Sequence, residues 1–449
     1  MAIDFTLTES QRRLQKVTRE FATEVLAPAV QKADEEPDTQ KAFQMMKGPY
    51  KEAYKLGLAM GFLPKEYGGG SVSNVDLQIV AEEICAVDPG FATIALVNGL
   101  GLMPVAWFGS EEQKRKWIGE ATRDPTAEYL AGWTVSEAAG TPGGTANFDS
   151  PGVGPIGIGL TATHDKGRGE YVLNGRKHWP CNAGGWDLKG ANVNVCIVRT
   201  DSKKGGKSGL SGMLVPRGAP GLSFEQPISK IGHRTCQNNS IVFENCRVPE
   251  ENVFAVGDGD LIISKAFTWS GPVAAIAAVG VARSAYEYVL RWSKTYTAGG
   301  GKPIMNHQAV GYALADVAMK IEACRAFSWK AAHYLDLHDS EGHAIGAMSK
   351  VLCGELMTSS VFKAMQVMGV NALDRKHPVE RYMRESMVFP LYDAGNLGMQ
   401  MRKIWGVMLD DSFDPRSFAD SRPIEFTKAM EGAGLGMDEP DKAALMAAE

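Results

Sequence analysis

The chain of 449 residues is 44% hydrophobic and 22% charged, which is typical of a globular protein with room for about three domains. Its formal net charge is −5 and its isoelectric point is near 6.0, so it lacks the basic surplus of nucleic-acid-binding proteins. We therefore expect no nucleic-acid partner. The first residues contain no basic segment followed by an apolar one, so no secretory signal is expected either.

Residues 1–130 are predicted to form an N-terminal helical domain. Thr8 and Gln11 have the spacing of a capping box, which marks the start of a helix. The apolar residues that follow recur at the spacing of one helical face: Leu14, Val17, Phe21 and Val25. Pro28 is expected to end this helix. The glycines at 68–70 and the capping residue Ser110 then introduce two further helical segments.

Residues 131–258 consist of short apolar runs separated by glycine, proline and polar residues, which predicts a middle β domain. Strands are expected at 170–173, 193–199, 212–215 and 240–243. Asn174 and Gly175 follow the first run, and this dipeptide is the strongest short signal for a hairpin turn. Long periodic segments from 259 to 412 predict a C-terminal helical domain. Residues 413–449 are expected to be a partly ordered tail.

Several features argue against other classes of protein. The most apolar long stretch, 272–281, is shorter than the roughly 20 residues that cross a bilayer, so we expect no membrane span and a cytoplasmic location. The seven cysteines form no Cys-x-x-Cys pair and the eight histidines show no ligand spacing, which predicts reduced thiols and no metal site. The string at 152–157 matches a dinucleotide fingerprint, but Pro155 favours a loop. The Gly-Lys-Ser at 206–208 lacks the earlier glycine of a P-loop and favours a hairpin tip.

Three local sequences stand out in this helical, β, helical order. The first is Trp-Thr-Val-Ser-Glu at 133–137 with Gly-Thr-Ala-Asn at 144–147, and the second is Lys-His-Trp-Pro-Cys-Asn at 177–182. The third runs without a gap from Gln-Val-Met-Gly at 366–369 to Tyr-Asp-Ala-Gly at 392–395. Together they resemble the acyl-CoA dehydrogenase superfamily across nearly the whole chain. The resemblance implies an α+β fold with an N-terminal helical domain, a middle β-barrel-like domain and a C-terminal four-helix bundle domain.

The resemblance also implies FAD as the cofactor. In the family, the first two segments lie along the flavin. Residues like those at 366–369 and the His-Gln pair at 307–308 reach the FAD of a neighbouring subunit, which implies a homotetramer or homodimer. The implied cofactor contacts are Trp133, Val135, Ser136, Thr145, Trp179, Cys181, His307, Gln308, Gln366, Gly369, Gly395 and Leu397.

The third segment places Asp393 at the position of the family's catalytic glutamate. Within the superfamily, the segments at 179–191 and 390–398 are most similar to the nitroalkane oxidase-like branch, which also uses an aspartate as base. Ser270 matches a serine that this branch keeps beside the base, and Gly271 stands where ordinary acyl-CoA dehydrogenases have an arginine. Two residues depart from the branch: Gln400 replaces an arginine close to the aspartate, and Cys181 replaces a serine near flavin N5. The implied catalytic residues are Asp393, Ser270 and Gln400.

The residues themselves support a base at Asp393. Removing a proton from carbon needs a carboxylate whose pKa is raised by removal from water, and the apolar run at 389–392 provides such cover. Taken alone, Asp393 is better explained as a helix or turn cap, Trp179 as a core aromatic and Ser270 as a small packing residue. For Ser270, its family position leaves the packing and catalytic interpretations equally open. The family positions of these residues favour the catalytic interpretation for Asp393 and the flavin contact for Trp179.

Two functions remain open from the sequence. The first is α,β-dehydrogenation of an acyl-CoA, in which Asp393 takes the α-proton, a hydride passes to the flavin and an electron-transfer flavoprotein accepts the electrons. The second is oxidation of a small nitroalkane or other carbon acid with O2. A third class, a flavin-bearing scaffold with decayed catalysis, is disfavoured by the carboxylate retained at 393.

Overall fold

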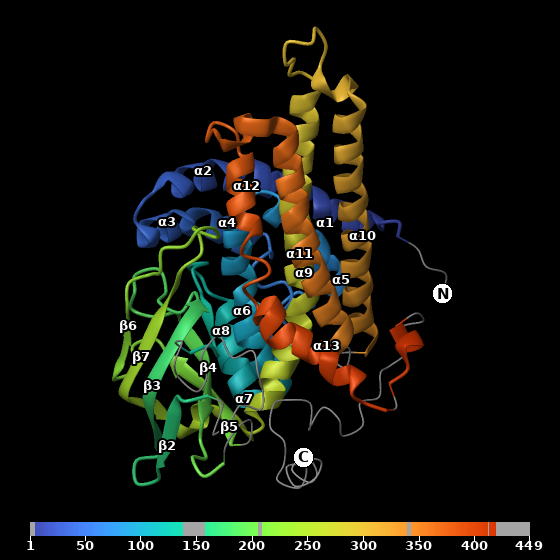
Figure 1. Cartoon of the computed structure of the whole chain (residues 1–449). Helices are drawn as coiled ribbons and strands as arrows, with labels where there is room; N and C mark the ends of the chain where they lie inside the picture. The colour runs from blue at the N-terminus through green and yellow to red at the C-terminus, as the bar shows by residue number, and fades with distance from the viewer. Residues whose placement is uncertain (1–4, 138–157, 205–208, 339–342, 412, 419–449) are drawn as a thin grey trace, which may run out of the picture.

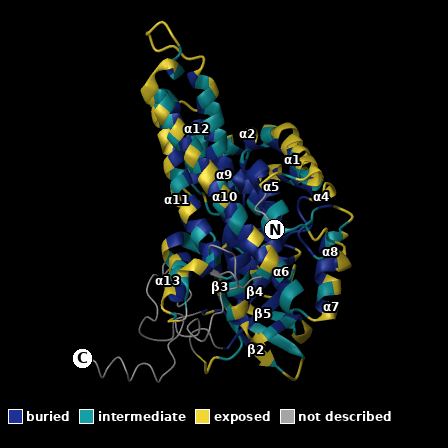
Figure 2. Cartoon of the chain, turned by 90° about the vertical axis from the view of Figure 1, so that its right-hand side faces the viewer, coloured by how far each residue is buried: buried dark blue, intermediate teal, exposed yellow. Residues whose placement is uncertain are grey.

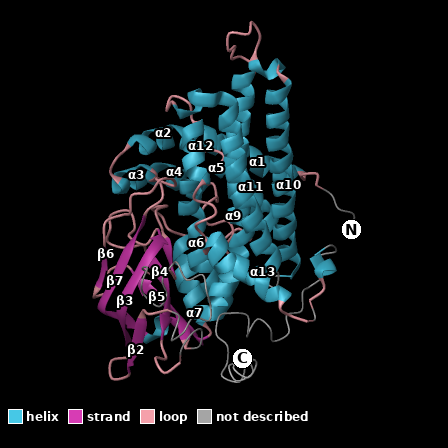
Figure 3. Cartoon of the chain, viewed as in Figure 1, coloured by secondary structure: helices cyan, strands magenta, loops and turns pink. Residues whose placement is uncertain are grey.

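The computed structural model describes residues 5–137, 158–204, 209–338, 343–411 and 413–418. Helices come first, a β-sheet follows, and long helices complete the chain (Figure 1, Figure 3). The sheet lies at one lower side of the molecule and the long C-terminal helices run along the other. This arrangement confirms the α+β class and the order of regions predicted from the sequence.

The N-terminal region is a set of helices with short π-helical and 3₁₀ turns between them. The α-helices are α1 Glu9–Glu20, α2 Ala27–Glu35, α3 Thr39–Met45, α4 Lys47–Lys55, α5 Asn74–Cys85, α6 Pro89–Phe108, α7 Glu111–Gln113 and α8 Gly119–Thr122. The turns are η1 Phe21–Leu26, η2 Lys65–Tyr67 and η3 Lys114–Ile118. The capping boxes at Thr8 and Ser110 are both formed as predicted.

The first helical face differs from its prediction. Val17 and Val25 are exposed, whereas Thr18 is buried because its hydroxyl donates to the Leu14 carbonyl at 2.8 Å and needs no water. Pro28 does not end the helical path. It lies in the first turn of α2, directly after the π-helical η1, where the missing backbone N–H is not needed.

The middle region forms an eight-stranded sheet in the order β6-β7-β3-β2-β4-β5-β8, with β1 paired to β4. The strands are β1 Ala131–Thr134, β2 Thr161–Asp165, β3 Glu170–Cys181, β4 Val193–Arg199, β5 Leu210–Pro216, β6 Leu222–Phe224, β7 Asn238–Pro249 and β8 Val253–Gly257, with the 3₁₀ turn η4 Glu250–Asn252 before β8. The predicted turn at Asn174 and Gly175 is wrong: both lie inside β3, where the pairing with β7 shifts register between Leu173 and Gly175. A glycine with φ of 142° and an asparagine that accepts from the Asn245 amide at 2.8 Å suit this bulge as well as they suit a turn.

The C-terminal region contains three long helices that pack on one another, and α12 lies against α9 and α11. Its α-helices are α9 Gly259–Ser293, α10 Gln308–His338, α11 His343–Met368, α12 Val379–Ser386 and α13 Met401–Met408. Its turns are η5 Ile304–Asn306, η7 Gly369–Leu373, η8 Gly395–Gln400 and η9 Pro415–Phe418. Figure 2 shows the buried residues concentrated where α5, α6 and α9 meet.

Two helices are long and apolar enough to span a bilayer by length and composition, namely α6 and α9. The sequence prediction considered only 272–281, whereas the helical segment around it extends over all of α9. In their most apolar windows, 67% of the α6 residues and 83% of the α9 residues are buried inside the protein. Such burial is typical of core helices and is weak evidence for a membrane span.

Charged groups join the helical regions where their apolar faces meet. Glu82 and Glu83 on α5 are buried, and each receives more than one guanidinium. Arg283 on α9 contacts Glu82 at 3.0 Å and Glu83 at 2.9 Å, Arg325 on α10 contacts Glu82 at 2.8 Å, and Arg19 on α1 contacts Glu83 at 2.6 Å. Buried carboxylates need such partners, so this network fixes how α1, α9 and α10 lie around α5.

A second buried ion pair connects β1 to β3. Lys177 on β3 is 0% exposed and its Nζ lies 3.1 Å from the carboxylate of Glu137, which is 2% exposed and follows β1. The same carboxylate accepts from the amides of Gly159 and Leu160 at 2.9 to 3.1 Å. Burial lowers the pKa of Lys177, and the charge of Glu137 opposes that effect.

We expect Glu137→Gln to destabilise the fold by about 3–5 kcal/mol, because it leaves a buried ammonium without its counter-charge. Glu225→Gln is the matched control, since it removes the partner of the exposed neighbour Arg176 on the same strand, where ion pairs contribute little. The measurement is the midpoint of urea unfolding followed by circular dichroism at neutral pH. Equal shifts in both variants would contradict the assigned role of the buried pair.

Candidate active site

Asp393 lies in a tight turn between α12 and η8. Asp393, Ala394 and Gly395 have φ values of 50°, 69° and 61°, so three consecutive residues are left-handed. Aspartate tolerates this region better than most residues, and glycine adopts it freely. The turn is closed by the Gly395 amide, which donates to the Tyr392 carbonyl at 3.0 Å, and by the Asn396 amide, which donates to the Pro390 carbonyl at 2.9 Å.

The two carboxylate oxygens of Asp393 have different surroundings. Oδ1 accepts a hydrogen bond from the Ser270 hydroxyl at 2.8 Å, and Ser270 is itself buried in the middle of α9. Oδ2 is buried and has no hydrogen-bond partner within the described residues. One oxygen is therefore held in place, while the other is available to accept a proton.

Two buried lysines act on this carboxylate, and the sequence analysis missed both. Lys350 on α11 is 1% exposed, and Lys403 on α13 is 7% exposed. Burial raises the pKa of Asp393, and the charges of Lys350 and Lys403 together with the Ser270 hydrogen bond oppose that rise. Burial lowers the pKa of each lysine to about 8 against the opposing charge of Asp393.

The lysines also differ in their hydrogen bonds. Lys350 Nζ donates to the Tyr392 carbonyl and to Asn396 Oδ1, both at 2.8 Å, so it holds both ends of the turn that carries Asp393. Lys403 Nζ lies 3.4 Å from the Ser264 carbonyl, and the charge of Asp260 acts on it as well as that of Asp393.

Gln400 is buried and contacts the backbone of Asp393, so its predicted catalytic role stays a prediction. Its Nε2 donates to the backbone carbonyl of Asp393 at 2.9 Å, and its Oε1 is buried without a hydrogen-bond partner in the described part of the chain. An amide side chain at this place positions the backbone of the base and contributes no charge. Lys403, three residues further along the chain, supplies a cation that Gln400 cannot.

The first two predicted flavin segments lie next to each other. The Lys177 ammonium donates to the Val135 carbonyl at 2.8 Å, and the His178 amide donates to the Ser136 carbonyl at 2.9 Å. These bonds continue β3 alongside the residues that follow β1. The predicted contact Thr145 lies outside the described residues.

The aromatic residues of these segments fit a planar ligand. Trp179 has a φ of 71° and is 41% exposed, which leaves a large ring unburied on a constrained backbone. Trp133 is buried, yet its Nε1 donor has no partner among the residues that the structure describes, and its ring lies edge-on to Phe267 with centroids 6.3 Å apart. Phe267 and Ser270 share α9, so β1 approaches the helix that contacts the base.

Cys181 connects the second segment to the third. The thiol is half-buried at the end of β3 and accepts from Asn238 Nδ2 at 3.0 Å. The charge of Asp393 acts on Cys181 and raises the pKa of its thiol, against stronger lowering effects. Cys181 therefore lies within the electrostatic surroundings of Asp393, whereas its implied contact with flavin N5 stays a prediction.

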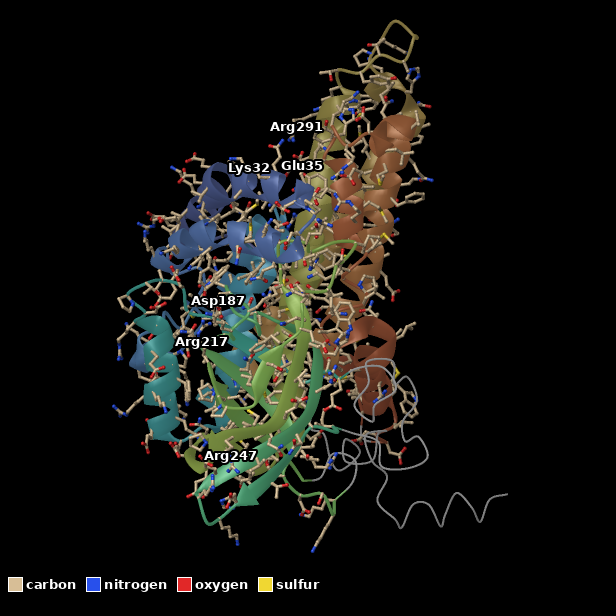
Figure 4. All side chains as sticks on the ribbon, turned by 90° about the vertical axis from the view of Figure 1, so that its left-hand side faces the viewer. Lys32, Glu35, Asp187, Arg217, Arg247 and Arg291 are labelled. Atoms are coloured by element: carbon tan, nitrogen blue, oxygen red, sulfur yellow. The ribbon has the colours of Figure 1, made fainter. Side chains whose placement is uncertain are left out.

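The loop after Cys181 is fixed to the rest of the protein at two places. Arg217 after β5 holds the Asp187 carboxylate at 2.9 and 2.7 Å, and both residues lie on the same face of the molecule (Figure 4). Trp186 stacks on Phe43 of α3 with ring centroids 4.6 Å apart. This loop belongs to the segment that resembles the nitroalkane oxidase-like branch.

The remaining predicted cofactor contacts fall into two groups. Gly395 and Leu397 adjoin Asp393, and Leu397 is 70% exposed. His307, Gln308, Gln366 and Gly369 are exposed. The helix segments around these four residues share a separate hydrophobic cluster at the upper ends of α10 and α11, away from the turn that precedes α13 (Figure 1). Within a single chain, these four residues therefore lie away from Asp393.

Models of the N-terminal, middle and C-terminal domains of acyl-CoA dehydrogenases match residues 8–124, 151–246 and 257–409. The chain belongs to the acyl-CoA dehydrogenase family. It is therefore a flavoprotein oxidoreductase, in a family whose members carry FAD. Among the described residues, no group of three or more His, Cys, Asp or Glu side chains is placed to hold a metal ion.

Relatives in this family include oxidases and dehydrogenases. Nitroalkane oxidase of Fusarium oxysporum is 30% identical over 432 residues, which cover 92% of this chain and 96% of that protein. The mitochondrial short-chain specific acyl-CoA dehydrogenase of Mus musculus is 28% identical over 394 residues, which cover 86% of this chain and 87% of that protein. The solved structure of the flavoprotein nitroalkane oxidase superposes with a TM-score of 0.86 at 28% identity, covering 94% of this chain and 100% of that one. The structure of butyryl-CoA dehydrogenase from Megasphaera elsdenii superposes with a TM-score of 0.78 at 25% identity, covering 91% of this chain and 100% of that one.

We expect Lys403→Met to move the acid limb of the pH profile for substrate-dependent flavin reduction upward by about one pH unit, because a nearby cation lowers the pKa of a carboxylate. Asp393 accepts a proton only when ionised, so activity falls as the pH drops through its pKa, and a raised pKa brings that fall to higher pH. Lys363→Met removes an exposed lysine from α11 and is the matched control. An unchanged profile in Lys403→Met would exclude the electrostatic role of Lys403.

Proposed function

We propose that this protein binds FAD and oxidises a small carbon acid, with a nitroalkane as the best supported substrate class and Asp393 as the base. The observation that carries the proposal is the asymmetric carboxylate: Oδ1 is held by Ser270 at 2.8 Å, and Oδ2 is buried with no hydrogen-bond partner among the described residues. A base in this state is oriented, has little water to displace, and has one free lone-pair direction for a proton.

The charges around Asp393 suit proton transfer from carbon. Burial raises the pKa of Asp393 and so strengthens it as a base, while the charges of Lys350 and Lys403 oppose that rise and favour the anion. When the proton has moved to Asp393, the same two cations face a substrate that has become an anion. Nitro groups stabilise such an anion, which is why a nitroalkane matches a site with a short base and fixed positive charge.

FAD supplies the electron acceptor for this oxidation when bound. Trp133, Val135, Ser136, Trp179 and Cys181 are the residues of the described chain that fit its flavin, since they include an exposed indole and an unpartnered indole N–H. His307, Gln308, Gln366 and Gly369 lie away from Asp393, so in our proposal they contact the FAD of a second subunit. A homodimer or homotetramer follows from that arrangement.

Dehydrogenation of an acyl-CoA is the second candidate function. It ranked first on the sequence alone, and the match to cyclohex-1-ene-1-carbonyl-CoA dehydrogenase of Geobacter metallireducens at 28% identity supports it. We now place it second for three reasons. Asp393 is shorter than the family glutamate, Gly271 stands where those enzymes have an arginine, and nitroalkane oxidase superposes with a TM-score of 0.86 against 0.78 for butyryl-CoA dehydrogenase. The electron acceptor is O2 in the first case and an electron-transfer flavoprotein in the second.

The deciding experiment is anaerobic titration of the FAD-loaded protein with a panel of nitroalkanes and acyl-CoA thioesters. We expect the visible absorbance of the flavin to bleach with a nitroalkane and to return on admission of O2. Bleaching by an acyl-CoA alone would establish the second candidate in its place. Protein that takes up FAD but bleaches with neither class would contradict both functions.

We expect Asp393→Asn to lower the rate of substrate-dependent flavin reduction by about 10²- to 10⁴-fold, because the amide is nearly isosteric but cannot accept the proton. FAD content and the unfolding midpoint should stay at the parent values. The measurement is anaerobic stopped-flow reduction at saturating substrate. A rate within a few-fold of the parent would remove Asp393 from the role of base.

Asp393→Glu tests whether the site requires the shorter carboxylate. The added methylene moves the carboxylate by about 1 Å, a misplacement that can cost around 10²-fold in rate. The left-handed backbone at 393 also disfavours the longer side chain. We expect a clear loss with nitroalkanes, measured as above, whereas a gain with acyl-CoA would favour the dehydrogenase.

A further inference from the structure

Two thiols meet beside the proposed flavin contacts. Cys181 at the end of β3 and Cys236 just before β7 both contact the side-chain amide of Asn238. Asn238 Nδ2 donates to Cys181 Sγ at 3.0 Å, and Cys236 Sγ lies 4.0 Å from Asn238 Oδ1. The β3–β7 pairing sets this geometry, because Cys181 and Asn238 are partners in its register.

The two sulfurs differ in access and in charge. Cys181 is half-buried, whereas Cys236 is 3% exposed. The Cys236 thiol, the charge of Lys230 and the Asn238 amide lower the pKa of Cys181, while burial and Asp393 oppose them. The interaction with the Cys181 thiol and burial together raise the pKa of Cys236. Cys181 is thus the partner with thiolate character, which makes it the nucleophile of the pair.

Lys230 organises this pair from the other side. Its ammonium donates to Asn238 Oδ1 and to the Cys236 carbonyl, the latter at 2.7 Å. A fixed cation, an amide donor and a neighbouring thiol around one accessible sulfur are the features of a redox-active cysteine with a second cysteine in reach.

We propose that Cys181 and Cys236 form a hydroperoxide-reactive dithiol, in which Cys181 is oxidised first and Cys236 then closes a reversible disulfide. The thiolate sulfur of Cys181 attacks one oxygen of hydrogen peroxide, an S–O bond forms, the O–O bond breaks, and hydroxide leaves and is protonated to water. The Cys236 thiol then loses its proton and its sulfur attacks Cys181 Sγ. The S–S bond forms, the S–O bond breaks and a second water leaves. The sulfurs give up two electrons and the peroxide accepts them.

The chain offers a matched control in Cys324 and Cys353. These cysteines are neighbours on α10 and α11, where the Cys353 thiol donates to the Cys324 carbonyl at 3.5 Å, but both are 0% exposed. Each of these two cysteines has another cysteine as its neighbour, but neither is accessible to solvent. A difference in reactivity between the two pairs therefore reports access and surrounding charge rather than proximity of two thiols alone.

The test treats reduced, substrate-free holoenzyme with a small molar excess of hydrogen peroxide. Catalase then stops the reaction, and the protein is denatured, alkylated, digested and analysed by mass spectrometry. We expect a peptide pair joined through Cys181 and Cys236, its disappearance with dithiothreitol, and full alkylation of Cys324 and Cys353. The reaction rate should rise with pH and level off below the value of about 8.5 at which a free cysteine ionises. Since peroxide is added directly, the result does not depend on the substrate proposed above.

Variants separate the two sulfur steps. In Cys236→Ser we expect Cys181 to stop at the sulfenic acid, trapped as a dimedone adduct, with no joined peptide. Cys353→Ser should leave the parent pattern unchanged. Cys236→Ala serves the same purpose if the serine variant loses FAD or folds poorly. Full alkylation of Cys181 and Cys236 after peroxide, or equal joining of Cys324 to Cys353, would overturn the proposal.

Discussion

A buried carboxylate is costly unless charges and hydrogen bonds compensate it, and the site around Asp393 is organised by that requirement. Ser270 from α9, Lys350 from α11 and Lys403 from α13 act on one side chain, so three helices must keep their relative positions. Lys350 has a second role, because its ammonium also donates to the Tyr392 carbonyl and the Asn396 side-chain amide on either side of the turn. Chemistry and packing therefore depend on the same electrostatic balance.

The sheet imposes the other constraint on the site. Lys177 and Glu137 form a dry ion pair that keeps β3 beside the end of β1, and the indoles of Trp133 and Trp179 are placed from these two strands. The arginine–glutamate network of α5 fixes the long helices against the N-terminal region. Ion pairs and hydrogen bonds thus fix the relative positions of strands and helices in a fold whose stability comes mainly from the burial of apolar side chains.

Local sequence signals predicted elements well and tertiary contacts poorly. The capping boxes at Thr8 and Ser110 were predictable because the partners are three residues apart. The Asn174 bulge was taken for a turn because both need the same backbone freedom, and only the pairing with β7 distinguishes them. Asp393 and Ser270 were found through family positions. Lys350 and Lys403 were missed because no local pattern marks a lysine as the neighbour of a distant carboxylate.

The left-handed turn at 393–395 has a consequence for the length of the base. Ala394 occupies a conformation that suits glycine, so the backbone of this turn is maintained by its surroundings rather than by its own preferences. The length of the base and the path of the main chain consequently depend on each other. A change in the length of the side chain at 393 therefore shifts the carboxylate relative to a main chain that the ammonium of Lys350 already holds.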